Sequence, residues 1–165
     1  MPTDTGLSLY NKILREGAYL FERVLDDVVS GKKINSRPQN LNKRKYYRRS
    51  DALDGHINWN WSAKRIVDFI RAGNYHPFAS PTYTAMLTFH EKVVLILRGK
   101  DAGYYNAISG NLIELTTEGP RISCGNNESV ILCQAIYKNK PIDFALWEQF
   151  FNDTEGEKFK GQING

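Results

Sequence analysis

Cysteine is scarce in this 165-residue sequence, which holds only Cys124 and Cys133. The two have no C-x-x-C spacing and no neighbouring histidine pair, which argues against a zinc site or another metal site. We expect both to be reduced thiols buried in a core. No apolar run reaches the roughly 18 residues of a membrane-spanning helix, and the first residues lack the pattern of a secretory signal. The sequence therefore predicts a cytoplasmic protein without a metal or a membrane segment.

Residues that carry catalysis are also few. The three histidines, His56, His76 and His90, do not stand beside a serine or cysteine nucleophile, so we expect them to be surface or hydrogen-bonded structural residues. The sequence has no glycine-rich phosphate loop and no H-E-x-x-H motif. The residues alone therefore indicate no catalytic constellation.

What is present is an ordinary globular composition, with 41% hydrophobic and 24% charged residues, so a core is expected. The net charge of +4 is compatible with a polyanionic partner such as a nucleotide, a sugar nucleotide or RNA. Much of the positive charge lies in residues 31–50, which contain eight Lys or Arg and no acid. Two interpretations stay open: a solvated linker, or a strip that faces an anion, with Tyr46 and Tyr47 as stacking or hydroxyl groups.

Hydrophobic periodicity predicts three helices. Residues 5–29 carry an apolar stripe behind a cap at Asp4 or Thr5, and this stripe needs a sheet or another helix to cover it. Residues 61–73 form a short expected helix, and residues 141–151 a closing helix.

Between these helices the apolar period changes to two. Five strands are expected, at residues 83–89, 92–98, 107–115, 119–124 and 129–137. Such short, evenly spaced strands favour a small antiparallel barrel of the oligonucleotide/oligosaccharide-binding type. The expected fold class is therefore α+β: a long helix, a linker and short helix, then an OB-like β-barrel with a closing helix.

The segment YRRSDALDGHINW at residues 47–59 resembles the Y-x-R-R-x-x-x-x-D-G-x-I-x-W segment of 10-formyltetrahydrofolate-dependent formyltransferases. The next helix is similar to that family's A-x-x-I-x-x-x-I-R-A helix. The start of the chain, residues 4–10, resembles the D-T-x-x-S-L-Y start of the last helix of the family's catalytic domain, and Gln39 matches a P-Q that follows it. Residues 108–134 and 140–151 resemble the C-terminal barrel more loosely.

The resemblance implies a division into four parts. Residues 1–31 are the last helix of a truncated, Rossmann-like catalytic domain, and residues 32–60 are a basic linker. Residues 61–151 are the C-terminal helix and barrel, and residues 152–165 are a polar tail. The family's catalytic Asn, His and Asp motifs do not occur in this sequence, so no catalytic residue is carried over. We expect the chain to be inactive without the missing catalytic half.

The resemblance also suggests ligands. The complete enzyme uses 10-formyltetrahydrofolate, which this chain is not expected to bind alone. Arg48 and Arg49 with the D-G-x-I-x-W pattern favour a nucleotide-linked amino sugar as formyl acceptor, and the loop at residues 71–81 departs from the P-Y-P-G-A form of tRNA enzymes. Initiator tRNA and another small amine remain alternatives. So do a non-catalytic nucleotide- or RNA-binding module, a structural partner of a separate catalytic half, and a homodimer.

Four residues are candidates for substrate binding: Arg48, Arg49, Arg71 and Tyr75. Each has a structural alternative. An arginine of the pair can brace the linker through Asp51 or Asp54, and Arg71 can cap its helix instead of binding an anion. Tyr75, like Phe78, lines either a substrate loop or the interface between domains. We expect a turn at Asp54-Gly55, and packing roles for Trp59 and Trp61.

Overall fold

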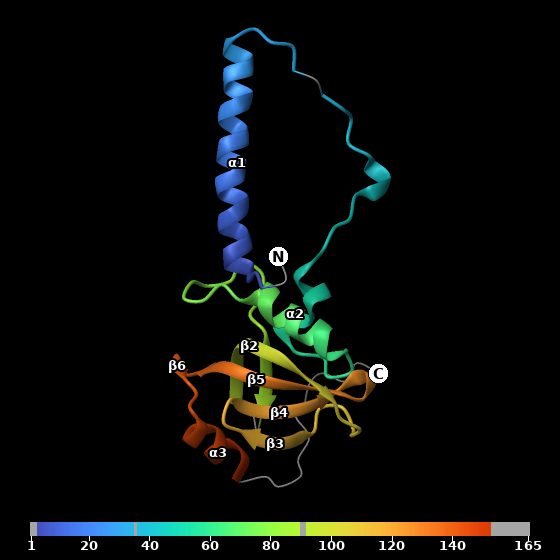
Figure 1. Cartoon of the computed structure of the whole chain (residues 1–165), viewed down its shortest axis with the longest axis vertical. Coiled ribbons are helices and arrows are strands. Elements are labelled where there is room, and N and C mark those ends of the chain that lie inside the picture. Colours follow the sequence, from blue (N-terminus) through green and yellow to red (C-terminus); the bar gives the residue numbers. More distant parts are fainter. Residues whose placement is uncertain (1–2, 35, 90–91, 153–165) are drawn as a thin grey trace.

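The computed structural model describes residues 3–34, 36–89 and 92–152, and it has an α+β architecture (Figure 1). Three α-helices and six strands follow one another, with short 3-10 turns between some of them. Their bounds are α1 Gly6–Val29, η1 Leu41–Lys43, η2 Arg49–Gly55, α2 Ala63–Gly73, β1 Met86–Phe89, β2 Lys92–Tyr104, β3 Leu112–Thr116, β4 Gly119–Cys124, η3 Gly125–Asn127, β5 Glu128–Tyr137, β6 Lys140–Pro141 and α3 Phe144–Asn152.

Helix α1 confirms the predicted long helix. The Thr5 side chain accepts a hydrogen bond from the Ser8 N–H, at 3.2 Å, and the Ser8 hydroxyl accepts one from the Thr5 N–H, at 2.9 Å. This reciprocal cap satisfies two N–H groups at the start of the helix. At the other end the chain turns at Gly31, whose φ of 70° suits glycine. Figure 1 shows that α1 stands away from the sheet and that its N-terminal end lies next to α2.

The strands form one antiparallel sheet in the order β1-β2-β5-β4-β3, with β6 paired to β5. The antiparallel strands are as predicted, but the sheet is not closed into a barrel: among the described residues no ladder joins β3 to β1. The free edge of β1 is instead occupied by the chain that enters the domain. His56 bridges to Met86, and the Ile57 N–H donates to the Met86 carbonyl at 3.1 Å. An edge that is already paired cannot close a barrel.

Two expected strands begin later than predicted. Tyr83 lies outside β1, because its hydroxyl donates to the Phe69 carbonyl at 3.0 Å and its ring stacks on Phe69. The segment before β3 makes a turn in which the Gly110 N–H donates to the Ser123 carbonyl at 2.8 Å. By contrast, β2 runs on to Tyr104, pairing with β5 through several register shifts.

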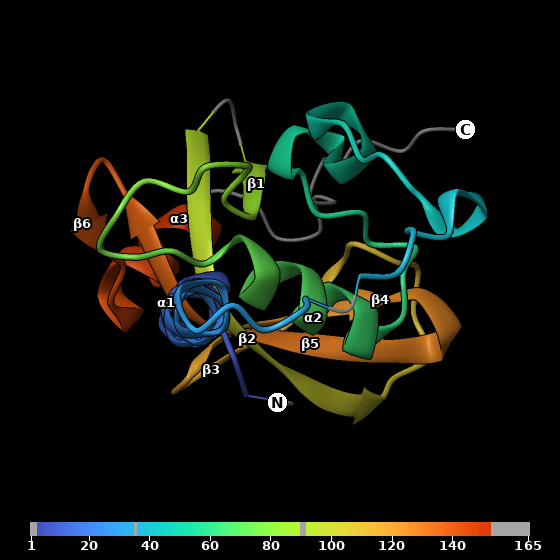
Figure 2. The same ribbon diagram turned by 90° about the horizontal axis from the view of Figure 1, so that it is seen from above.

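The core lies between the sheet and the two short helices. Figure 2 shows α2 lying across β2 and β5, and its Ile66 and Ile70 side chains are fully buried. Trp59 belongs to the same core, which confirms its predicted packing role. Helix α3 adds Trp147 and Phe151, which stack at 5.6 Å between ring centroids.

The cysteines lie at different depths. Cys124 is buried in the core, as predicted, and its burial raises the pKa of its thiol to about 12. Cys133 is only partly buried, so it is not the core thiol that we expected. His90 lies outside the described residues.

None of the described helices is long and apolar enough to span a bilayer. Within the same residues no cluster of three or more His, Cys, Asp or Glu is placed to hold a metal ion.

Candidate functional site

The structure brings two of the four candidate residues together. Arg71 and Tyr75 lie at the end of α2 and line a cleft of about 290 Å³ beneath the first turn of α1. Arg48 lies apart from them, exposed in the linker before η2. The side chain of Arg49 is outside the described part of the structure.

The first turn of α1 is seated directly on this end of α2. The Leu7 N–H donates to the Asn74 carbonyl at 3.1 Å, and the rings of Tyr10 and Tyr75 lie 6.3 Å apart. Gly6 is buried at this contact. Any larger residue would be excluded, because its Cβ would collide with the Ala72 carbonyl oxygen and the Tyr75 ring. Tyr75 therefore packs against the start of α1 at this junction, and its role in substrate binding stays a prediction.

The charges in the cleft are paired. The Arg71 guanidinium forms an ion pair with Asp68, and Asp68 also accepts a hydrogen bond from the Lys64 ammonium at 2.6 Å. The Lys64 hydrogen bond, followed by the one from Arg71, holds the pKa of the Asp68 carboxyl below its usual range. Asp4 is likewise held ionised by Lys12, 2.7 Å away, which lowers the pKa of its carboxyl. The ion pair with Asp68 was not among the predicted roles of Arg71.

Asp51 contacts the backbone of the linker arginine. Its carboxylate accepts a hydrogen bond of 2.7 Å from the backbone N–H of Arg48. The predicted turn at Asp54-Gly55 is confirmed, since Asp54 has a φ of 50° and Gly55 a φ of 94°. The side chain of Arg48 stays exposed.

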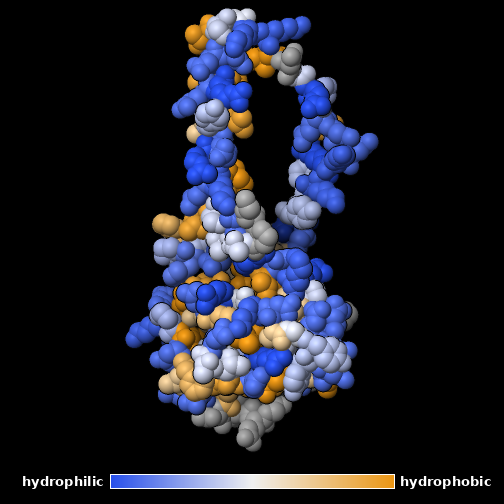
Figure 3. All heavy atoms as spheres, viewed as in Figure 1, coloured by the Kyte–Doolittle hydropathy of each residue, from blue (hydrophilic) through white to orange (hydrophobic). Residues whose placement is uncertain are grey.

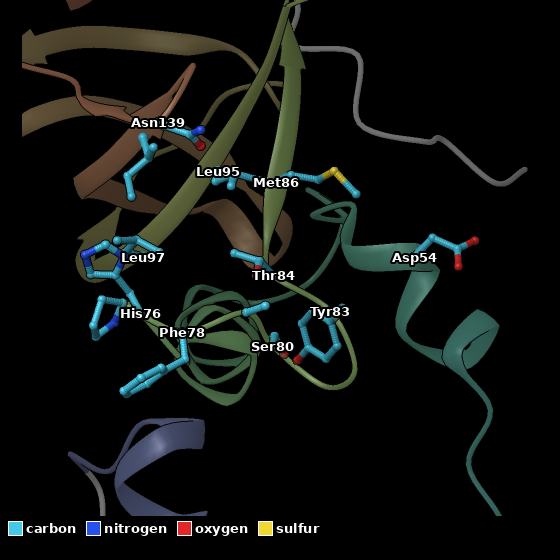
Figure 4. A pocket seen from close by; sticks show the side chains of 13 residues that line it. Asp54, His76, Phe78, Ser80, Tyr83, Thr84, Met86, Leu95, Leu97 and Asn139 are labelled. Carbon is cyan, nitrogen blue, oxygen red and sulfur yellow. The ribbon is translucent and has the colours of Figure 1, made fainter.

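A larger cavity, of about 650 Å³, lies between the loop after α2 and the sheet (Figure 4). Apart from the Pro- and Ser-rich loop, no motif of the sequence points to this cavity. Its lining comes from four separate parts of the chain: Asp54, His76, Pro77, Phe78, Ala79, Ser80, Tyr83, Thr84, Met86, Leu95, Leu97, Ile136 and Asn139.

The third feature is the exposed apolar side of α1, along which Figure 3 shows hydrophobic side chains at intervals. Phe21 is 63% exposed and Ile13 61% exposed. We call this side the apolar face of α1; its members are Leu9, Tyr10, Ile13, Leu14, Leu20, Phe21, Val24, Leu25, Val28 and Val29. A soluble domain rarely leaves a patch of this size uncovered unless a partner binds there.

The sequence pattern described as "Formyl transferase, C-terminal domain" matches residues 49–152. The chain therefore belongs to the formyl transferase C-terminal domain family.

A similar curated protein is also a formyltransferase. The chain is 29% identical over 159 residues to a methionyl-tRNA formyltransferase of Sulfurihydrogenibium sp. (strain YO3AOP1), a match that covers 95% of this chain and 49% of the relative. The chain thus spans about half the length of that curated relative.

Two solved structures share the fold. One is WlaRD, a sugar 3N-formyl transferase crystallised in the presence of dTDP and 5-N-formyl-THF, with a TM-score of 0.53 and 21% identity over 83% of this chain and 45% of that chain. The other is an N-formyltransferase from Helicobacter canadensis in complex with folinic acid and dTDP-3-aminofucose. Its TM-score is 0.55, with 22% identity over 80% of this chain and 45% of that chain.

Proposed function

We propose that this chain is the acceptor-side part of a formyltransferase that moves a formyl group from 10-formyltetrahydrofolate to the amine of a nucleotide-linked amino sugar. In this proposal α1 is a helix of the catalytic half, residues 32–60 link it to the sheet domain, and the 165 residues alone transfer no formyl group. The apolar face of α1 is the observation that carries the proposal.

The width of this face indicates what covers it. At about 100° per residue, its members occupy about half of the helix circumference. A two-stranded coiled coil covers a narrower seam, whereas a helix packed on a sheet or between two elements covers a broad one. Burying each of these half-exposed side chains contributes on the order of 1 kcal/mol. The Rossmann-like sheet expected in a formyltransferase catalytic half is a surface broad enough to cover this face.

The donor does not fit the described part of this chain. The cleft beneath α1, at about 290 Å³, lies at the low end of the range for small-molecule sites, and its cation Arg71 is already paired. The larger cavity has no Lys or Arg in its lining to meet the carboxylates of a folate. We therefore propose that the donor binds in the catalytic half.

The contribution of this chain is to hold and orient the acceptor. The exposed guanidinium of Arg48 is available to a phosphate, and Arg49 is proposed for the same role from the sequence. Arg71 and Tyr75 are proposed from the sequence for contacts with the acceptor, and both line the cleft at the α1–α2 junction, where Arg71 is paired with Asp68. Holding the amine at the right distance from the formyl carbon supplies the effective concentration that such a transfer needs.

Initiator tRNA is the second candidate acceptor. The described linker residues on either side of position 35 are exposed and carry Lys and Arg without an acid before Asp51, which suits a phosphate backbone. The identity to the methionyl-tRNA formyltransferase extends over nearly the whole chain.

The test is formyl transfer, measured with the chain alone and with the chain mixed with the N-terminal half of the Sulfurihydrogenibium relative. Each sample receives 10-formyltetrahydrofolate and either dTDP-3-aminofucose or methionyl-tRNA. We expect no transfer by the chain alone and transfer to the amino sugar by the mixture. Transfer to methionyl-tRNA only would favour tRNA as the acceptor. Transfer by the chain alone would contradict the proposal that these 165 residues need a separate catalytic half.

A further inference from the structure

The cavity of about 650 Å³ between the loop after α2 and the sheet has walls that are fixed by their own contacts. Met86 pairs with Leu95 in the sheet, which sets the floor. The loop is held at one end by Asn74, whose side chain donates to the Leu97 carbonyl at 2.8 Å and accepts from the His76 N–H at 2.9 Å. The Phe78 N–H donates to the Tyr75 carbonyl at 2.8 Å. The cavity is therefore formed before any ligand arrives.

The opposite wall is fixed as well. Tyr83 stacks on Phe69 with ring centroids 4.5 Å apart and donates its hydroxyl to the Phe69 carbonyl. Its burial raises the pKa of the phenol to about 12, so this wall stays uncharged even well above neutral pH. The cavity is bounded on this side by a rigid aromatic ring.

The free polar groups of the cavity are few and mostly neutral. In the described part of the chain, the side chains of His76, Thr84 and Asn139 form no hydrogen bond to the protein. Asp54 brings the only carboxylate of the lining, and none of the thirteen lining residues is Lys or Arg. This is unusual in a chain with 22 Lys and Arg residues, and it makes the cavity a poor phosphate site.

The mouth carries an exposed aromatic side chain. Phe78 is 68% exposed, and Figure 4 shows it at the same side of the cavity as His76. An apolar floor, aromatic groups at the edge and a few neutral hydrogen-bonding groups together suit a flat, uncharged ring with polar edges.

We infer that this cavity binds the nucleobase end of the acceptor, with the phosphates left outside it. This inference rests on the proposed nucleotide-linked acceptor and adds the place where its base is held. Because the lining has no cation, the uncharged nucleoside should bind through the same contacts as the nucleotide, and the phosphates should be met by other parts of the enzyme.

The experiment uses the 165-residue chain and thymidine, followed by backbone amide NMR shifts of Ser80, Thr84 and Asn139. We expect saturable shifts with thymidine and none at these amides with inorganic pyrophosphate. Phe78→Ala should weaken thymidine binding at least about fivefold, since one base–aromatic stack is lost. Phe144→Ala, which removes another exposed phenylalanine outside the cavity, should change the affinity less than twofold.

Three results would overturn the inference: no thymidine shifts, shifts caused by pyrophosphate, or equal effects of the two variants. Because Phe78 is largely exposed, its removal should not unfold the chain, and far-UV circular dichroism checks this. The transfer assay of the mixture is independent of these shifts. If transfer to the amino sugar occurs without thymidine binding, the proposed function stands and only the location of the base is wrong.

Discussion

The carboxylate of Glu128 accepts a hydrogen bond of 2.7 Å from the backbone N–H of Ala63, a residue 65 positions earlier in the chain. Ala63 is the first residue of α2, so its N–H has no partner inside the helix. A negative charge at this end also interacts favourably with the helix dipole. The first residue of β5 therefore fixes the start of the helix that covers the sheet.

Replacing Glu128 by alanine should lower the free energy of unfolding by about 1–3 kcal/mol, because the N–H of Ala63 loses its acceptor. Glu128→Gln keeps an acceptor oxygen and should cost less. Urea denaturation measures both. Glu118→Ala is the matched control, since the Glu118 carboxylate forms an exposed pair with Lys100, and its loss should cost no more than about 1 kcal/mol. Equal losses for Glu128→Ala and Glu118→Ala would show that the contact does not hold α2.

Gly6→Ala should displace the first turn of α1. The new methyl group would collide with the Ala72 carbonyl oxygen and the Tyr75 ring. The hydrogen bond from Leu7 to Asn74 would then be lost, and hydrogen exchange at the Leu7 amide should become faster.

Gly17→Ala is its control on the same helix, because a Cβ at Gly17 meets nothing within 4 Å. This change should stabilise α1 by about 0.5–1 kcal/mol through helix propensity. Unchanged Leu7 exchange in Gly6→Ala would mean that α1 is not anchored at its first turn.

Stability should fall at alkaline pH. Burial raises the pKa of Cys124 from 9.0 to about 12, with nearby Glu128 and Asp101 adding to the effect, and burial raises the pKa of Tyr83 from 10.0 to about 12. The folded state thus holds both protons more tightly than the unfolded state does. Their contribution is complete below about pH 9 and is lost as the pH rises toward 12.

Urea denaturation at pH 7, 9 and 11 measures this dependence. Cys124→Ala should flatten the decline, since the alanine variant has no thiol to titrate. A wild-type profile that stays level from pH 7 to 11 would contradict the buried, protonated thiol.

The helices were predictable because the signals that make them are local. The cap at Thr5, the apolar spacing of α1 and the stop at Gly31 all lie within one stretch of sequence. The prediction for α2 succeeded for the same reason, with Ser62 accepting from the Arg65 N–H at 3.3 Å.

The open sheet was not predictable from strand spacing. Whether β1 and β3 pair depends on the chain at His56 and Ile57, which reaches β1 from about 30 residues earlier and occupies its edge. The alternation of apolar and polar residues in the strands does not indicate that contact.

The site was only partly predictable. Arg71 and Tyr75 were both candidates from the sequence, but their shared cleft and the pairing of Arg71 with Asp68 depend on side-chain geometry. The large cavity joins Asp54, the loop around Phe78, β2 and Asn139, which no short motif connects.

The most direct test of the central claim is a calorimetric titration of this chain with the N-terminal half of the Sulfurihydrogenibium formyltransferase. Phe21→Glu places a charge on the apolar face of α1, and Tyr19→Glu places one on the opposite side of the same helix, about 200° away. Both aromatic rings are similarly exposed, at 63% and 57%. We predict binding by the wild type and by Tyr19→Glu, and loss of binding in Phe21→Glu. No binding by the wild type, or equal binding by the two variants, would contradict the proposal that α1 docks on a catalytic half.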